Sequence, residues 1–467
     1  MIKTDRVSLE AQLKQIEHIE QTPYISIVQK INPIDPLNLF AHFAHLKGER
    51  FYWSNAAGDL TFVGLGTFKE LYTDSSDDRF LAIQDQLNQL KESINVLHDF
   101  DVEGVGPVFF GGFSFFDTPH RKEWESFPEN NFVLAKQMLT VKQGEYFLTH
   151  HIEVSPNDSI EVLLNQIEQE TEAIYEAGLF VQETRKLEEV QDQLSFDQWS
   201  SMIAHAIEEI QTTNLEKVVL AREVEAVFDR TIPTEDLLYA LTNQQQHSYV
   251  FVMEQGEEAF IGASPERLVS VTNQVMYSAC LAGTTSRGET MDVDDLLAWR
   301  LLNDEKNLEE HRYVVNMIRE AVQPICTHLD IPNEPQIYPL KNIQHLYTPV
   351  QGQLKPEVTL FDTLKKLHPT PALGGEPRQD AMNFIKMHEP IERGWYAAPI
   401  GWFDQSLNGE FAVAIRSGLI AGNRIKLFAG CGVVADSDAK AEYDETNLKL
   451  TPMLDALGGN RDDDYGE

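Results

Sequence analysis

Short apolar runs and alternating apolar and polar positions, separated by turn residues, dominate the first third of the chain and predict β-strands. Residues 50–54 and 60–64 flank a polar turn and predict one hairpin, and residues 132–141 and 144–154 predict a second. The stretch 105–116 is rich in glycine and phenylalanine, which is typical of a buried strand with close backbone neighbours.

Apolar residues spaced three and four apart predict helices among these strands. Ser195, followed three residues later by Gln198, resembles a capping box at the start of one helix. One long helix is expected to run unbroken to residue 322, and the last helix is expected to be interrupted near Pro452. The predicted helices cover residues 1–20, 158–176, 195–211, 234–243, 292–322 and a segment from about residue 438.

The remaining apolar segments predict further strands joined mainly by short turns. Asn408-Gly409 lies between two of them and is a strong hairpin signal. These strands cover residues 217–228, 248–254, 258–263, 267–272, 275–279, 395–403, 410–420 and 424–434. Hairpin connections favour an α+β fold with antiparallel sheets over a doubly wound parallel sheet.

The polar residues 182–194 are expected to form a connector between two regions of the chain. We expect a mostly strand-rich part over residues 1–194 and a second region over residues 195–457, folded together as one structural domain. Residues 458–467 are polar and acidic and predict a frayed tail.

The chain of 467 residues carries 74 acidic and 37 basic residues, a formal net charge of −37. This balance, without clustered basic residues, argues against nucleic acid or an anionic membrane as a partner. The N-terminus lacks the apolar core of a signal peptide, and no apolar run approaches the roughly 20 residues that a membrane helix needs. We therefore expect a cytoplasmic protein, and any anionic substrate would need local cations to overcome the repulsive field.

Three cysteines, Cys280, Cys326 and Cys431, lie far apart and lack metal-ligand spacing. This pattern argues against a disulfide framework and against a zinc site. The chain also lacks the glycine-rich fingerprints of dinucleotide and ATP binding.

Two acidic clusters on predicted helices could hold a cation. Glu310 lies on or beside the apolar stripe of its helix, and Glu442, Glu445 and Lys449 share one face of the last helix. Salt bridges on the helix surface are the ordinary explanation for both clusters. Alternatively, two helices that each present a glutamate would suit Mg²⁺, which takes oxygen ligands and bridges to an anionic substrate.

Four further polar features lie on or beside predicted strands. Lys217 opens a strand, Glu266 stands in a turn beside Arg267, Gly283-Thr284 lies at a strand end, and Arg416 lies within a predicted strand. Lysine and arginine in strands usually reach solvent, and a turn glutamate beside arginine usually forms a solvated ion pair. Residue types alone favour these ordinary explanations.

Taken together, these segments resemble the chorismate-utilising enzyme family of anthranilate, aminodeoxychorismate, isochorismate and salicylate synthases. Each segment is weak alone, whereas ten of them in the family's order, from about residue 195 to residue 457, are very specific. They are Lys-Val-Val-Leu-Ala-Arg (217–222), Gly-Ala-Ser-Pro-Glu-Arg (262–267), Leu-Ala-Gly-Thr (281–284), Glu-His (310–311), Gln-His-Leu (344–346), His-Pro-Thr-Pro-Ala-Leu-Gly-Gly (368–375), Glu-Arg-Gly-Trp-Tyr (392–396), Ala-Ile-Arg (414–416), Ala-Gly-Cys-Gly-Val-Val (429–434) and Glu-Thr-Asn-Leu-Lys (445–449).

The resemblance implies two stacked antiparallel β-sheets flanked by helices, with a chorismate-binding catalytic region over residues 195–457. It also implies Mg²⁺ as cofactor, with Glu310 and Glu445 as ligands and Glu442 close by. Arg416 and Tyr396 would grip the enolpyruvyl carboxylate of chorismate. By matching position, the substrate-binding residues would be Gly283, Thr284, His345, Ala372, Tyr396, Arg416, Gly430, Gly432 and Lys449.

A few positions separate branches of the family. Isochorismate and salicylate synthases share the lysine at 217, which implies Lys217 as the general base that activates water and Glu266 as the general acid for the departing hydroxyl. Ala282 replaces the nucleophilic lysine of some aminodeoxychorismate synthases, and isochorismate synthases tend to have alanine at 372. Residues 51–54 replace the tryptophan-sensing strand of anthranilate synthases, and with water as the nucleophile no glutaminase subunit is expected.

These positions imply an isomerase that converts chorismate to isochorismate, with water adding at C2 and the C4 hydroxyl leaving. The length of the N-terminal region favours the menaquinone pathway. A salicylate synthase, a siderophore-pathway isochorismate synthase and an inactive chorismate-binding or scaffold protein are the alternatives.

Overall fold

A hydrogen-bonded network of strands organises the part of the chain that the structure describes. The structure is a computed structural model that describes residues 6–15, 23–73, 78–117, 124–155, 158–183, 185–339 and 343–458. Within these residues 21 strands form one network. Every pairing is antiparallel except the one between β1 (Tyr24–Ile31) and β4 (Ile94–Val96).

The strand β6 (Asn130–Lys142) is the joint of this network. One of its edges pairs with β3 (Leu60–Thr73), and the other pairs first with β5 (Val108–Phe113) and then with β7 (Glu145–Glu153). Two arms of strands therefore diverge from β6, one through β3 and one through β5.

The first arm continues from β3 through eight more strands and forks at its end. In order of pairing it contains β2 (Arg50–Ser54), β10 (Tyr249–Gln255), β11 (Glu258–Ser264), β20 (Ser417–Ala421), β21 (Arg424–Val433) and β9 (Lys217–Phe228), with β8 (Leu187–Asp192) and β17 (Gly375–Glu376) both on the far edge of β9.

The second arm continues from β5 through seven more strands and also forks at its end. In order of pairing it contains β18 (Pro399–Asp404), β19 (Gly409–Val413), β12 (Arg267–Thr272), β13 (Val275–Ser286) and β16 (Ile343–Leu354), with β14 (Cys326–Asp330) and β15 (Gln336–Pro339) both paired to β16.

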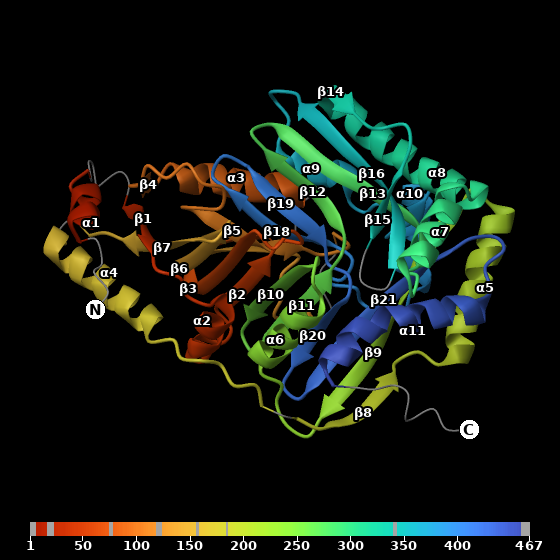
Figure 1. The fold of residues 1–467 in the computed structure, drawn as a ribbon, viewed down its shortest axis with the longest axis horizontal. Coiled ribbons are helices and arrows are strands. Elements are labelled where there is room, and N and C mark those ends of the chain that lie inside the picture. The colour runs from red at the N-terminus through yellow and green to blue at the C-terminus, as the bar shows by residue number, and fades with distance from the viewer. Residues whose placement is uncertain are drawn as a thin grey trace.

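Helices cover the outer faces of these arms (Figure 1). Helices α2, α3, α6 and α11 contact strands of the first arm, and α8 and α9 contact strands of the second, while α3 also packs against α9. The helices are α1 (Arg6–Leu13), α2 (Pro36–His42), α3 (Arg79–Lys91), α4 (Ile160–Tyr175), α5 (Phe196–Thr212), α6 (Thr234–Gln244), α7 (Met291–Leu302), α8 (Glu305–Val322), α9 (Leu360–Leu367), α10 (Arg378–His388) and α11 (Ala439–Ala456), with short 3₁₀ turns at Ala44–Leu46 and Gln323–Ile325.

Strand β10 shows why these strands are apolar on both faces. Tyr249, Phe251 and Met253 point into the large cluster between the arms, whereas Val250 and Val252 point into a second cluster beneath α2 and α6. A strand buried on both faces needs a continuous apolar run, because both sets of alternating side chains leave water.

Aromatic contacts join the two arms across the larger cluster. Phe51 of the first arm lies 4.9 Å from Phe110 of the second, and Phe62 lies 5.3 Å from Trp402, measured between ring centroids. The predicted α+β architecture of stacked antiparallel sheets is therefore confirmed, with the addition that the two sheets share β6.

The two predicted N-terminal hairpins, the hairpin signal at Asn408-Gly409 and the capping box are confirmed. β18 pairs with β19 across Asn408-Gly409. β2 pairs with β3, and β6 pairs with β7. Ser195 accepts a hydrogen bond from the backbone N–H of Gln198, and the Gln198 side chain accepts one in return.

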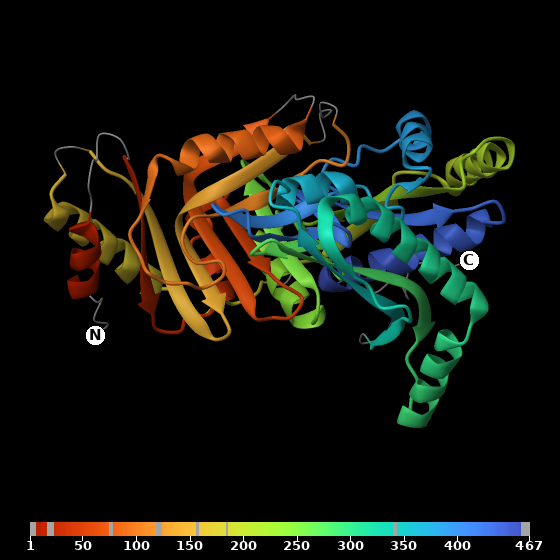
Figure 2. The same ribbon diagram turned by 90° about the horizontal axis from the view of Figure 1, so that it is seen from above.

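Several predicted element boundaries are wrong. The expected helix 292–322 is two helices, because Asp304 ends the first run and caps α8 by accepting from the N–H of Asn307. Figure 2 shows α7 projecting away from the body of the molecule. The predicted connector 182–194 contains the edge strand β8, and α11 continues through Pro452.

The predicted strand 410–420 is also wrong, in a way that matters for the site. Arg416 has a φ of 51°, a left-handed conformation that ends a strand. The chain forms β19 in the second arm before this residue and β20 in the first arm after it. Arg416 therefore lies at a crossing between the arms and not within a strand.

Both ends of the chain lie partly outside the described residues. Of the predicted helix 1–20, residues 6–15 are described and α1 ends at Leu13. The predicted acidic tail lies outside the described residues apart from Gly458. None of the described helices combines the length and apolar character needed to cross a bilayer.

A substitution at the joint tests this architecture. A β-carbon at Gly111 of β5 would lie 1.8 Å from the backbone oxygen of Asn131 in β6. Because a backbone atom in a ladder cannot move aside, we expect Gly111→Ala to destabilise the protein by on the order of 1–3 kcal/mol or more. Chemical denaturation checks this, with Gly178→Ala as control, because nothing lies within 4 Å of a β-carbon there. Equal stability of the two variants would contradict the proposed joint.

Candidate active site

Two glycines on β21 leave one face of this strand without side chains where it pairs with β9. Gly430 and Gly432 lie opposite Ala221 and Val219 of β9. A β-carbon at Gly432 would lie 2.6 Å from Cε of Lys217, so any larger residue there would displace the lysine. The glycines thus let a lysine at the start of β9 lie across the neighbouring strand.

Tyr396 uses the second opening. Its ring stacks on Phe428 at 5.2 Å, and its Oη would lie 3.3 Å from a β-carbon at Gly430. Burial raises the pKa of Tyr396 to about 12, so its hydroxyl remains a donor. Lys217 and Tyr396 therefore lie over neighbouring positions of one strand, at the same face.

Glu266 lies in the turn between β11 and β12, where β12 belongs to the second arm. Its own backbone is held, because its N–H donates to Ser264 Oγ and its carbonyl accepts from Val413. Burial raises the pKa of Glu266 to about 7, against the opposing pull of Arg416 and Lys449. A carboxyl group in this state holds a proton near neutral pH and can donate it.

Arg416 brings charges from several segments together. Burial lowers its pKa, while Tyr396, Glu266 and Glu445 act against that shift. Burial lowers the pKa of His345 and Arg416 acts in the same direction, so that ring lies within reach of the same charge. The crossing between the arms places this guanidinium among side chains of both arms.

The helix α11 contributes Lys449 and two of the predicted acidic residues. Lys449 Nζ donates to the carbonyl of Gly430 at 2.9 Å and to Glu445 at 2.6 Å. Glu442 accepts from Ser437 Oγ with one oxygen, while its buried Oε2 has no hydrogen-bond donor among the described residues. The Cys431 thiol lies beside this carboxylate, and burial, reinforced by Glu442, raises the pKa of Cys431.

The paired strands β13 and β16 carry three further predicted site residues. Thr284 Oγ1 and His345 Nδ1 lie 2.8 Å apart, and Gly283 has a φ of 80° that a side chain would strain. Burial raises the pKa of Cys280 to about 12, with Glu266 and Glu310 as the next largest causes. Glu310 of α8 therefore lies within electrostatic reach of the same thiol as Glu266.

The acidic side chains near this site decide whether it could bind a metal ion. No three His, Cys, Asp or Glu side chains of the described chain gather into a preformed metal centre. Glu310 and Glu445 are exposed, and the buried Oε2 of Glu442 lacks a donor. Mg²⁺ commonly uses one or two carboxylates with waters and an anionic ligand, so this donor set fits it.

Among the predicted site residues, Ala372 has the least direct contact with the others. It is exposed, in a loop that β9 holds through a hydrogen bond from the N–H of Val219 to the carbonyl of Gly374. Glu389, which accepts from the backbone of β9, was not among the predicted residues. Glu389 lies outside the motifs that carry the family resemblance, so no sequence pattern selects it. Its partner Arg393 lies within the motif 392–396.

An antiparallel α+β fold that gathers a half-buried acid, an amine and several cations is suited to an enzyme for a small anionic substrate. The family described as chorismate binding enzyme matches residues 11–458. The chain belongs to this family, which confirms the resemblance found in the sequence.

Two relatives and two solved structures agree with this assignment. Isochorismate synthase MenF of Bacillus subtilis is 43% identical over 421 residues, 89% of each chain. The salicylate biosynthesis isochorismate synthase of Pseudomonas aeruginosa is 34% identical over 87% of this chain and 84% of that protein. The menaquinone-specific isochorismate synthase MenF of Escherichia coli has a TM-score of 0.79 at 26% identity, over 97% of this chain and all of that one. Anthranilate synthase component I of Streptococcus pneumoniae, with a TM-score of 0.65 at 22% identity over 97% of this chain and 98% of that one, shares the fold.

The raised pKa of Glu266 has a consequence for stability. Its folded-state pKa of about 7 exceeds the ordinary value of 4.5, so between these pH values the folded protein keeps a proton on Glu266 that the unfolded chain loses. The free energy of unfolding therefore falls as pH rises from 4.5 through 7. We expect Glu266→Gln to be more stable than the parent at pH 8.5 by about 1–3 kcal/mol, with a smaller advantage at pH 5.5. Urea denaturation at both pH values checks this. Glu309→Gln, an exposed neighbour of Glu310, is the control, and the same pH dependence in both variants would refute the assignment.

Proposed function

We propose that this protein is an isochorismate synthase that converts chorismate to isochorismate for menaquinone synthesis. The observation that carries the proposal is geometric: Glu266 lies within electrostatic reach of Arg416 and Lys449, and Lys449 donates to Gly430 on the same strand whose Gly432 lies under Lys217. The names of the similar proteins from Bacillus subtilis and Escherichia coli support both the reaction and the pathway.

The cations account for binding a substrate with two carboxylates. Arg416 and the hydroxyl of Tyr396 hold the enolpyruvyl carboxylate, beside the backbone of Gly430 and Gly432. The ring carboxylate lies toward Lys449 and toward a wall formed by Gly283, Thr284 and His345, next to the loop of Ala372. Charge-assisted hydrogen bonds of this kind are about twice as strong as neutral ones, which favours a dianion despite the net charge of the protein.

The acid and the base carry out the exchange of hydroxyl groups. Lys217 accepts a proton from a water molecule, and the water oxygen forms a bond to C2 of the ring. The ring double bonds shift, the bond between C4 and its hydroxyl oxygen breaks, and Glu266 donates the proton that lets this oxygen leave as water. One water enters and one leaves, so the reaction is an isomerisation that uses no ammonia and no glutaminase subunit.

Mg²⁺ is part of the proposed mechanism. Glu310 and Glu445 would hold the ion, with Glu442 near it, and the bound ion supplies positive charge that orients and neutralises the ring carboxylate. Glu445 also pairs with Lys449 at 2.6 Å, so this glutamate links the metal ligands to the residue that faces the carboxylate.

Lys217 variants test its role as a base. We expect Lys217→Ala and Lys217→Arg to lose at least about 100-fold in kcat, because arginine keeps the charge but cannot exchange the proton. Chromatography of reactions with chorismate and Mg²⁺ should show isochorismate from the parent protein, and calorimetry should show chorismate binding to both variants. Activity in the arginine variant would show that Lys217 supplies only charge, and salicylate with pyruvate from the parent would identify a salicylate synthase.

The metal ligands make a separate prediction. Excess EDTA should abolish turnover, and added Mg²⁺ should restore it.

Glu310→Gln should raise the Mg²⁺ concentration for half-maximal rate by on the order of 10-fold or more, because the ion loses a charged ligand. The adjacent Glu309→Gln serves as the control with an unchanged Mg²⁺ requirement, and identical titrations for the two variants would exclude Glu310 as a ligand.

A further inference from the structure

A buried ion pair lies directly beside the β9 strand that carries Lys217. Glu389 and Arg393 have side chains that are 2% and 1% exposed, and two hydrogen bonds of 2.7 Å join them. The guanidinium also lies 4.2 Å from the ring centroid of Phe115. Neither residue has a part in the proposed chemistry.

The pair takes the place of a missing strand on one edge of β9. This edge pairs with β17 at Lys217 and Val218, and with β8 only from Val224 onward. Between these strands, the N–H of Ala221 donates to Glu389 at 2.9 Å, and the carbonyl of Val219 accepts from Arg393 at 2.8 Å. Backbone groups that would otherwise be buried without partners are thus satisfied by two charged side chains.

Arg393 also connects β9 to two other segments of the site. Its Nη1 donates to the carbonyl of Leu373, next to Ala372, at 3.0 Å. Its own carbonyl accepts from the N–H of Tyr396 at 2.8 Å. The strand of the proposed base, the loop before β17 and the backbone of Tyr396 therefore meet at one residue.

We propose that Glu389 and Arg393 are positioning residues that hold Lys217 at a fixed place relative to Tyr396, and so align the base with the bound substrate. This inference rests on the proposed function. A general base must lie within hydrogen-bond reach of the proton it removes, and displacement by about 1 Å can reduce the rate on the order of 100-fold. Lys217 lies two residues from Val219, so a shift of the strand edge moves the amine with it.

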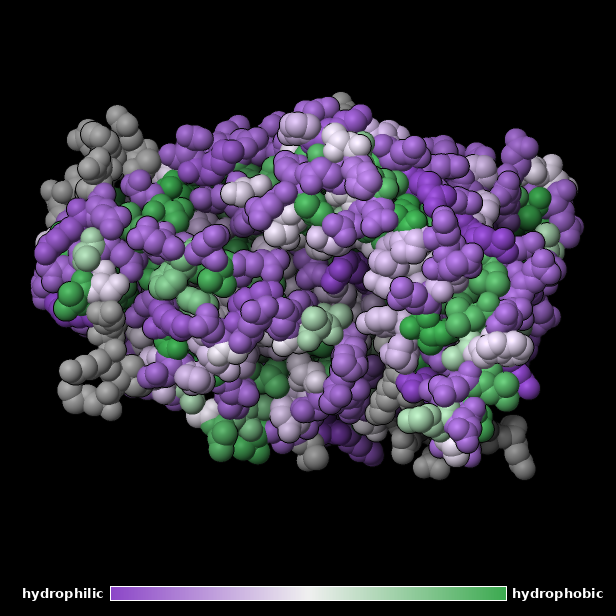
Figure 3. Space-filling view, turned by 45° about the horizontal axis from the view of Figure 1, so that its top comes forward, coloured by the Kyte–Doolittle hydropathy of each residue, from purple (hydrophilic) through white to green (hydrophobic). Residues whose placement is uncertain are grey.

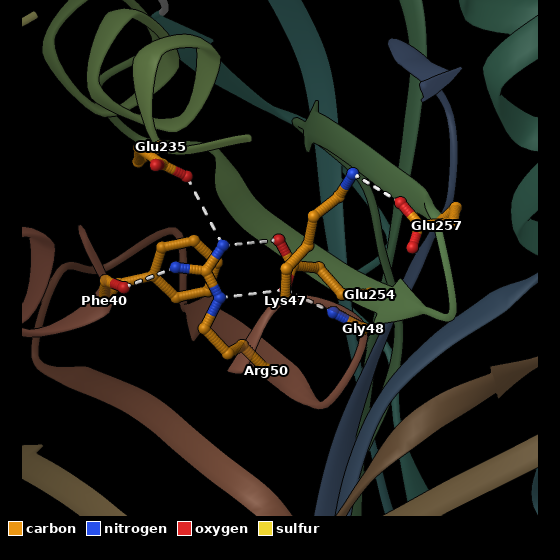
Figure 4. A network of polar contacts seen from close by, with 7 residues as sticks. All are labelled: Phe40, Lys47, Gly48, Arg50, Glu235, Glu254 and Glu257. Carbon is orange, nitrogen blue, oxygen red and sulfur yellow. Dashed lines mark hydrogen bonds and ion pairs between the residues drawn. The ribbon is translucent and has the colours of Figure 1, made fainter. Parts of the chain in front are cut away.

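A second buried pair in the same chain provides a matched control. Arg50 and Glu254 are 2% and 0% exposed. Figure 4 shows that this pair makes the same kinds of contact, because Glu254 accepts from the N–H of Gly48 and Arg50 donates to the carbonyl of Phe40; Arg50 has Glu235 as a further partner, at 3.3 Å. Arg50 also lies 4.2 Å from the ring centroid of Phe40. None of these partners is a predicted site residue.

The experiment compares Glu389→Gln and Arg393→Lys with Glu254→Gln and Arg50→Lys. We expect all four variants to lower Tm. The first two should also lower kcat per folded molecule by about 10- to 100-fold, with KM for chorismate changed less than about 3-fold, because the amine is displaced while the carboxylate anchors remain. The pH profile of kcat should shift in these two variants only.

A readout without turnover separates this proposal from the proposed function. The rate of Lys217 acetylation at different pH values, followed by mass spectrometry, reports the surroundings of the amine whatever product the enzyme makes. We expect its pH dependence to change in Glu389→Gln and Arg393→Lys and to remain that of the parent in the control pair. If the parent forms no isochorismate but this difference persists, the proposed function fails and the positioning role stands.

Two outcomes overturn the proposal. One is equal kcat and equal Lys217 labelling in both pairs of variants, which would make Glu389 and Arg393 ordinary stabilising residues. The other is a failure of both site variants to fold while both control variants fold, which would make the pair structural.

Discussion

The pairing of β9 with β21 is the constraint on which the site depends. This ladder sets Gly432 opposite Val219 and Gly430 opposite Ala221. Because side chains alternate along a strand, the two glycines leave two openings on one face, and Lys217 and Tyr396 occupy them. A shift of one residue in register would turn these openings to the other face and place side chains under the lysine.

The two arms of the network explain how a strongly acidic protein can gather cations in one place. The chain has a net charge of −37. Even so, Arg416 and Lys449 both lie close enough to Glu266 to lower its pKa. Hydrophilic residues cover most of the face in Figure 3, and salt screens charges that face solvent. Charges inside the site are screened less and determine which ligand is bound.

Apolar patterning predicted most strands and helices here because each of these elements buries a defined face. It located β10, β21 and α5 closely, and the ordered motifs located the catalytic region. Local patterning does not encode the events that assemble the site. The left-handed conformation of Arg416 separates two strands that the apolar pattern predicts as one strand. Asp304 begins a new helix where the pattern predicts one continuous helix. The contact of Glu389 with Ala221 spans 168 positions and depends on the tertiary fold.

The acid of the proposed reaction is balanced between two opposing effects. Burial raises the pKa of Glu266 to about 7, while Arg416 and Lys449 pull it down. These two cations are also the proposed anchors of the substrate carboxylates. When an anion binds them, its charge offsets theirs, and their effect on Glu266 weakens. Substrate binding therefore moves the carboxyl group toward its protonated form, so the acid gains its proton in the same complex in which the leaving hydroxyl needs one.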